Sequence, residues 1–122
     1  MKTYICQICG DAYIGEEKPK NCPFCGAREN FIKLGNEADP IVNQKFEISK
    51  ISGENLKKTY DLEVKAVAIY NCMSARTKSY EIKVMYERLS KVEMEHATIV
   101  AKILKMDKIE IGKEFCYFMK IR

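Results

Sequence analysis

The sequence lacks the features that mark membrane, exported and nucleic-acid-binding proteins. It has no apolar run of about 18 residues, the length that a membrane-spanning helix needs, and its first ten residues lack the apolar stretch of a secretory signal. The formal charge is +4, but acidic and basic residues are interleaved, and the longest basic run is only Lys57-Lys58. We therefore expect a cytoplasmic protein with no membrane and no nucleic-acid partner.

Glycine and proline are missing from residues 54–106, whereas the first 35 residues are dense in cysteine, glycine, proline and tyrosine and show no helical period. A chain of 122 residues has room for one ordinary domain or two small ones. The composition predicts an α+β protein with a small cysteine-rich domain, a linker, a helical hairpin and a tail, at residues 1–34, 35–52, 53–106 and 107–122.

The region that lacks glycine and proline is predicted to form two helices. Ser52 is a candidate N-cap for a first helix that runs to about Arg76, and Ser79 can cap a second helix over residues 80–105. Because the connection between them is so short, the two helices must lie side by side and antiparallel. The tail has strand-like composition around a Gly112-Lys113 turn, which predicts a short β-hairpin.

Six cysteines are present, and four of them form two Cys-x-x-Cys-Gly turns: Cys6 with Cys9, and Cys22 with Cys25. In a chain with no export signal this pattern indicates a metal rather than disulfides. Each turn brings two thiolates to one metal, and the glycine that follows permits a positive φ and an amide hydrogen bond to sulfur. Two facing turns predict a closed tetrahedral site for iron or zinc.

The remaining two cysteines, Cys72 and Cys116, have no metal-ligand neighbours in the sequence. We expect both to be small buried hydrophobic residues rather than ligands.

Both predicted helices carry an apolar stripe interrupted by metal-ligand residues. Glu63 lies in the stripe of the first helix, and Glu93 and His96 lie one turn apart in the stripe of the second. The apolar members are Leu56, Tyr60, Val67 and Tyr70 on the first helix, and Met85, Leu89, Val92, Ile99, Val100 and Ile103 on the second. A carboxylate among apolar side chains is costly unless it is paired or binds a metal.

A Glu-x-x-His pair on one helix and an inward glutamate on its neighbour match the ligand pattern of di-iron carboxylate bundles. The competing interpretation is that Glu93 and His96 are three residues apart by chance, as often happens on solvated helices. Their position within apolar stripes favours a metal site.

The chain resembles the rubrerythrins in both parts. Residues 4–19 (YICQICGDAYIGEEKP) and 21–27 (NCPFCGA) are similar to the rubredoxin-type domain of that family. Residues 55–63 (NLKKTYDLE) and 92–97 (VEMEHA) are similar to the first two helices of its ferritin-like domain. The hairpin also resembles that of the two-helix encapsulated ferritins.

The resemblance implies a mononuclear iron centre at the four cysteines that passes electrons, although zinc also suits four sulfurs. It further implies that Glu63, Glu93 and His96 are iron ligands, with one of the glutamates bridging two irons. The implied activity is reduction of hydrogen peroxide, with electrons from an external donor such as a rubredoxin or a flavoprotein reductase.

One hairpin supplies two glutamates and the chain's single histidine, whereas a di-iron site takes about four carboxylates and two imidazoles. We therefore expect a homodimer or higher oligomer in which two hairpins form a ferritin-like four-helix bundle and share the di-iron site.

Two other functions compete with peroxide reduction. The first is a ferroxidase related to iron storage, which would consume ferrous iron and dioxygen. The second is a zinc-ribbon adaptor on a helical dimer, in which Glu63 and His96 have no metal role. A relay-type cysteine site favours the peroxidase.

Overall fold

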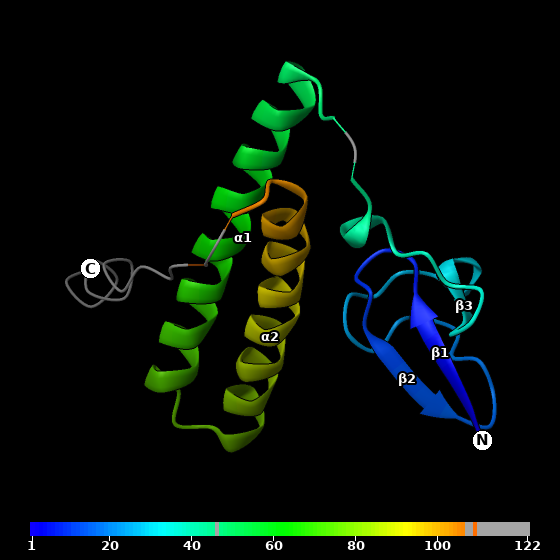
Figure 1. Cartoon of the computed structure of the whole chain (residues 1–122). Coiled ribbons are helices and arrows are strands. Elements are labelled where there is room, and N and C mark those ends of the chain that lie inside the picture. Colours follow the sequence, from blue (N-terminus) through cyan, green and yellow to red (C-terminus); the bar gives the residue numbers. More distant parts are fainter. Residues whose placement is uncertain (46, 107–108, 110–122) are drawn as a thin grey trace. The chain divides into compact units, whose positions relative to one another are not determined.

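The computed structural model describes residues 1–45, 47–106 and 109, and the chain divides into two compact units, Met1–Ile48 and Ser49–Arg122 (Figure 1). The first unit contains a small sheet and the second a helical hairpin, which confirms the predicted α+β fold. The β-hairpin predicted for the tail, and Cys116 with it, fall outside the described residues.

A three-stranded antiparallel sheet forms the first unit, with strands β1 (Lys2–Cys6), β2 (Ala12–Gly15) and β3 (Ile32–Leu34). The strand order is β2-β1-β3, so the central strand β1 pairs with both neighbours. Alternate residues of β1 point to the same face, and Tyr4 and Cys6 are buried there. The core of this unit consists of few side chains: Tyr4, Cys6, Cys9, Cys22 and Ile32. So small a core needs additional stabilisation, which a bound metal can supply.

Part of the predicted linker is fastened to the first cysteine turn. The Asp39 amide donates to the side-chain Oε1 of Gln7 at 2.7 Å, and the Ile41 amide donates to the Gln7 carbonyl at 2.7 Å. A short 3-10 helix, η2 (Ile41–Asn43), follows, and a second one, η1 (Glu29–Phe31), precedes β3. Residues 39–41 therefore belong structurally to the first unit.

Helix α1 spans Lys50–Arg76, and helix α2 spans Tyr80–Ile103. The N-cap of α2 is Ser79, as predicted, and its hydroxyl oxygen accepts a hydrogen bond from the Ile82 amide at 3.4 Å. Helix α2 ends two residues before the predicted Lys105, which adopts a left-handed φ of 58° that stops the helix.

The predicted N-cap of α1 is wrong. The cap is Ser49, whose hydroxyl oxygen accepts a hydrogen bond from the Ser52 amide at 3.2 Å, so Ser52 lies inside the first turn. A glycine within a helix costs only about 1 kcal/mol relative to alanine, so Gly53 does not prevent the earlier start.

Small side chains occupy the best-buried positions of the hairpin: Val67, Ala68, Cys72 and Ser74 on α1, and Ser90, Ala97, Val100 and Ala101 on α2. Hydrogen bonds also join the two helices. The Ser90 hydroxyl lies 2.5 Å from Asn71 Oδ1, and the Ser74 hydroxyl lies 3.3 Å from Glu87 Oε1. The rings of Tyr70 and Tyr86 stack with centroids 6.0 Å apart. These contacts define how α1 and α2 are aligned.

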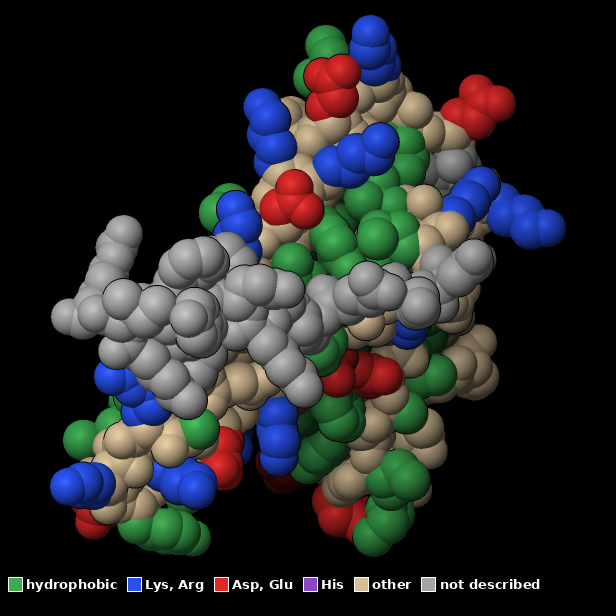
Figure 2. Space-filling model, turned by 90° about the vertical axis from the view of Figure 1, so that its left-hand side faces the viewer, with side chains coloured by type: hydrophobic (Ala, Val, Ile, Leu, Met, Phe, Trp, Pro, Cys, Tyr) green, Lys and Arg blue, Asp and Glu red, His purple; other side chains and the backbone are tan. Residues whose placement is uncertain are grey.

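The predicted apolar stripes lie mostly beside this buried contact. Of their apolar members, only Val67 and Val100 are buried, while Leu89 and Val92 are half-buried and Met85 is exposed. In Figure 2, hydrophobic side chains accordingly lie at the surface over the helices, with charged side chains around them. The stripes form a face that one hairpin leaves partly open. In the described part of the chain, neither helix combines the length and apolar character that crossing a membrane requires.

Candidate metal centres

The four cysteines of the two turns converge in the first unit. The sulfurs of Cys6 and Cys25 are 3.7 Å apart, as are those of Cys9 and Cys22, and all four sulfurs lie within 4.8 Å of one another. Cys6, Cys9 and Cys22 are buried and Cys25 is half-buried. The cluster therefore forms a compact four-sulfur site shielded from solvent on most sides.

The two turns repeat one hydrogen-bonding pattern. The Gly10 amide donates to the Cys6 carbonyl at 2.9 Å, and the Gly26 amide donates to the Cys22 carbonyl at 3.0 Å. Both glycines have the positive φ that was predicted, 80° and 83°. The predicted amide-to-sulfur bond, however, comes from the residue after the glycine. The Asp11 amide lies 3.4 Å from the sulfur of Cys9.

Burial and mutual proximity oppose full ionisation of these thiols. Burial raises the pKa of Cys9 well above its ordinary value. Burial, with neighbouring charges at Cys22 and Cys6, raises the pKa of Cys25 to about 12. Burial acts on Cys22 as well, but hydrogen bonds from the amides of Cys25 and Phe24 and from the neighbouring thiols together outweigh it and lower that pKa. A cation at the centre removes the conflict, because metals bind cysteine as thiolate.

The sulfur spacing fits a tetrahedral metal. Metal–sulfur bonds of about 2.3 Å place the sulfurs of a regular tetrahedron about 3.8 Å apart. The two 3.7 Å sulfur–sulfur distances agree with that value. The cluster therefore fits a rubredoxin-like iron site.

The second cluster lies on the hairpin and combines Glu63 of α1 with Glu93 and His96 of α2. His96 Nδ1 lies 3.6 Å from Glu63 Oε2 and 3.3 Å from Glu93 Oε2. If one ligand atom is taken from each residue, the three atoms all lie within 4.8 Å of one another. The side chains are 34% exposed for His96, 21% for Glu63 and 22% for Glu93, so the cluster is half-buried.

The surroundings of Glu63 disfavour its charged form. Burial raises the pKa of Glu63 from 4.5 to about 7, and the hydrogen bond and charge of Glu93 add to the rise, while His96 opposes it. A divalent cation would stabilise both carboxylates as anions. Two carboxylates and an imidazole are a donor set that iron accepts, and the cluster fits one part of a di-iron carboxylate site.

Three contributors to these sites were not predicted from the sequence. Gln7 anchors the segment after the sheet to the first cysteine turn, and Asp11 supplies the amide that faces a sulfur. Ser90 bonds Asn71 across the hairpin, close in sequence to Glu93. Asp11 acts through its backbone amide, which almost every residue type carries, and Gln7 acts through its side chain and carbonyl on residues more than 30 positions away, so the local sequence holds no signal for either. A serine in the middle of a helix is the one available hint for Ser90.

The comparison with known proteins agrees with both sites. Residues 4–32 match the family described as "Rubrerythrin, rubredoxin-like domain", and residues 54–118 match the family described as "Rubrerythrin". Reverse rubrerythrin-1 of Clostridium acetobutylicum is 31% identical over 114 residues, which cover 85% of this chain and 62% of that protein. No solved structure matches the chain significantly.

A four-cysteine knuckle together with a carboxylate–histidine hairpin defines a protein of the non-haem iron class. Because the rubrerythrin match spans more than half of the sequence, the chain belongs to the rubrerythrin family. This confirms the resemblance drawn from the cysteine turns and the Glu-x-x-His pair. The chain spans about 62% of the length of the relative reported above.

Proposed function

We propose that this chain is a non-haem iron oxidoreductase that reduces hydrogen peroxide to water at a di-iron site. The observation that carries the proposal is the convergence of Glu63, Glu93 and His96 within 4.8 Å in a half-buried cluster on the hairpin. Family membership supports iron chemistry there, and a four-cysteine centre in the same chain suits electron supply.

Each site has a distinct role in this proposal. Cys6, Cys9, Cys22 and Cys25 hold one iron in a closed set of sulfurs, which leaves no open position for substrate. An iron pair at the carboxylate site supplies two electrons, the number that converts one hydrogen peroxide and two protons into two waters. Glu63 and Glu93 offset the charge of the metals, and His96 contributes a nitrogen ligand whose position is set by α2.

We place the iron pair between two copies of the chain. The described hairpin contributes two carboxylates and one imidazole, about half of the usual set of four and two. The apolar stripes that flank the ligands are half-buried or exposed in one hairpin, and a second hairpin would bury them. A homodimer thus completes the ligand set and covers the open face in one step.

An external donor must restore the electrons consumed by peroxide. A reduced rubredoxin or a flavoprotein reductase suits this role, because either can deliver electrons singly to a four-sulfur iron centre. The cysteine site then acts as an entry point and the carboxylate site as the place of reaction.

The decisive experiment compares oxidants. Iron-loaded protein, reduced anaerobically, is mixed with hydrogen peroxide or dioxygen in a stopped-flow instrument, and reoxidation of the carboxylate-bound iron is followed by absorbance. We expect peroxide to react much faster than dioxygen. His96→Ala should abolish the reaction without removing the visible ferric–thiolate absorption of the cysteine site.

Glu81→Ala serves as the matched control, because Glu81 is an exposed carboxylate of α2 outside the cluster. That variant should react like the unmodified protein. If dioxygen were the faster oxidant and ferrous iron were consumed in large excess over the sites, the ferroxidase function would replace the peroxidase.

A further inference from the structure

A lysine-rimmed hollow lies on the sheet of the first unit. Its volume is about 330 Å³, and it is lined by Lys2, Tyr4, Lys18, Ile32, Lys33, Leu34 and Glu37. Three of these side chains are cationic and one is anionic. The others are aliphatic or aromatic, so the hollow combines a positive rim with an apolar floor.

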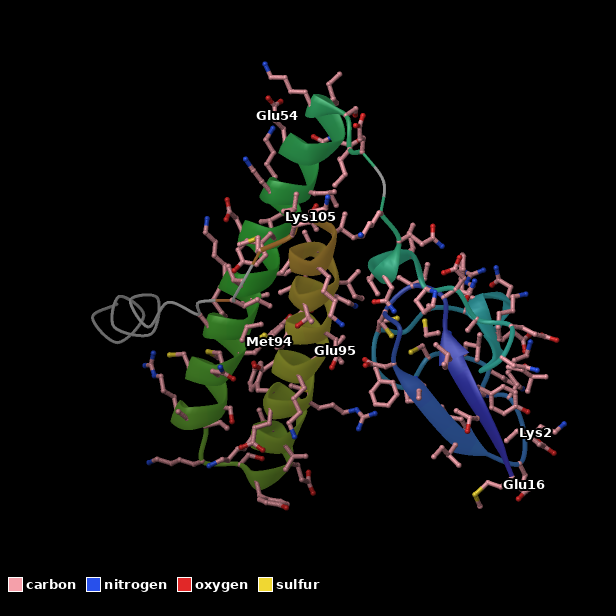
Figure 3. The ribbon with its side chains drawn as sticks, in the orientation of Figure 1. Lys2, Glu16, Glu54, Met94, Glu95 and Lys105 are labelled. Atoms are coloured by element: carbon pink, nitrogen blue, oxygen red, sulfur yellow. The ribbon has the colours of Figure 1, made fainter. Side chains whose placement is uncertain are left out.

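The rim keeps its positive charge in the surroundings that the structure describes. Lys2, Lys18 and Lys33 are all exposed. Figure 3 shows Lys2 and Glu16 at the same end of the sheet, but the Glu16 carboxylate lies 3.2 Å from the amino group of Met1. Its charge is therefore paired with the amino terminus, and Glu37 is the acidic residue among those lining the hollow.

The floor connects the hollow to the four-cysteine site. Tyr4 and Ile32 line the hollow and also a second, smaller cavity that is bordered by Cys6 and Cys22. Ile32 is the register partner of Cys6 on the neighbouring strand, and Tyr4 precedes Cys6 by two residues on the same face of β1. Tyr4 and Ile32 thus lie between the hollow and the cavity that Cys6 and Cys22 border.

We propose that this hollow is the docking surface for an acidic redox protein that reduces the four-cysteine centre. The inference rests on the proposed function and identifies where the electron donor binds and what charge it carries. The partner loses one electron and the iron held by the cysteines gains it, with no bond or proton exchanged. A partner with carboxylates around its own redox centre complements the lysines and sits over Tyr4 and Ile32, which also line the cavity bordered by Cys6 and Cys22.

An apolar floor inside a charged rim is the usual anatomy of a protein–protein interface. It differs from a small-anion site, where backbone and side-chain donors converge on a point. Long-range attraction between opposite charges also suits a short-lived electron-transfer complex, because it raises the association rate without demanding a large interface.

The test measures binding rather than turnover. Protein with zinc in the cysteine site, which is redox-silent, is titrated with an acidic rubredoxin and with an acidic flavoprotein reductase at low ionic strength. The readouts are calorimetry and amide chemical shifts. One variant carries Lys2→Glu, Lys18→Glu and Lys33→Glu. The matched control carries Lys50→Glu, Lys57→Glu and Lys58→Glu on α1, which changes the net charge equally.

We expect the hollow variant to weaken binding by about tenfold or more and the α1 control to change it by less than about threefold. In the native protein, binding should shift the amides of Tyr4, Lys33 and Leu34 and should weaken steeply with added salt. The single variant Lys33→Gln should show a smaller loss of binding affinity. This variant tests the proposal even if the triple variant is unstable.

Equal weakening by both triple variants, or no binding of either redox protein, would overturn the proposal. So would inorganic phosphate or a DNA duplex binding at the hollow in place of the acidic proteins. Peroxide should reoxidise the chemically reduced hollow variant at the native rate, because no donor is present. Loss of the peroxide reaction in native protein with intact docking would instead refute the proposed function alone.

Discussion

Oε2 of Glu63 on α1 lies 3.6 Å from Nδ1 of His96 on α2, although the two residues are far apart in the sequence. The same nitrogen lies 3.3 Å from Oε2 of Glu93, one turn earlier on α2. One imidazole nitrogen therefore faces two carboxylates. Such a site holds a proton or a cation between its acids, and a metal is the cation that would bind all three groups at once.

The pKa of Glu63 predicts how the iron-free protein responds to pH. Its folded-state pKa of about 7 exceeds the ordinary 4.5, first because of burial and then because of Glu93. The folded chain therefore binds more protons than the unfolded chain between these values, and stability falls as the pH rises through that range. Iron-free protein should melt a few degrees lower at pH 8 than at pH 5.

Glu63→Gln should flatten that pH dependence, because glutamine carries no proton to lose. Asp61→Asn, which changes an exposed carboxylate on the same helix, should leave it intact. Differential scanning calorimetry of the three proteins between pH 5 and pH 8 makes the comparison. An unchanged slope in Glu63→Gln would show that this carboxylate is not the group responsible.

Cys9→Ser should unfold the first unit while leaving the helices in place. Few side chains are buried in that unit, so its folding depends on the binding energy of the metal. Hydrogen exchange should lose protection over residues 2–34, and far-ultraviolet circular dichroism should keep its helical signal. Lys20→Ser, an exposed change in the same unit, is the control, and persistent protection in Cys9→Ser would contradict the prediction.

Gly10→Ala should destabilise the cysteine site more than Gly26→Ala. Both positions have a positive φ, which costs an alanine about 1–2 kcal/mol. A Cβ at Gly10 would also lie 3.3 Å from Cγ2 of Val42, whereas nothing lies within 4 Å of one at Gly26. The denaturant midpoint for metal release should reveal the difference.

The double variant Gly10→Ala with Val42→Ala isolates the steric part of that cost. Removing the Val42 methyl groups should bring the stability cost of Gly10→Ala close to that of Gly26→Ala. If the two single variants, Gly10→Ala and Gly26→Ala, lowered the denaturant midpoint for metal release equally, the contact between the first cysteine turn and η2 would have no energetic role.

Met85→Lys should weaken self-association, whereas Val84→Lys should not. Met85 belongs to the apolar stripe that contains His96, while Val84 lies next to it in sequence and so on a different face of α2. The two side chains are similarly exposed, at 47% and 42%. A lysine buried in the proposed dimer interface would lack a partner, which would shift the equilibrium toward monomer.

Sedimentation velocity over a range of concentrations measures that shift, together with iron content per chain. The iron bound at the carboxylate site should fall in parallel with dimer formation in Met85→Lys. A native protein that sediments as a folded monomer and still binds two irons per hairpin would refute the shared site.

Much of the cysteine site follows from local spacing. Cys6 and Cys9 are three residues apart and followed by Gly10, so a turn with a positive φ is dictated by neighbouring residues alone, as it is in the second turn. The placement of Glu93 and His96 on one side of α2 follows equally from helical periodicity. Both patterns depend on interactions within a few residues of chain, which sequence displays directly.

The tertiary structure decided which groups meet across longer distances. Ser49 rather than Ser52 is the N-cap of α1, and the local sequence does not decide between two serines that can both cap a helix. The helical period placed Glu63 and His96 in apolar stripes, but it did not show that small residues such as Ala97 and Ser90 form the buried contact between the helices. Helices approach most closely where side chains are short, so packing, rather than hydrophobicity alone, selects the contact face and leaves the stripe open beside it.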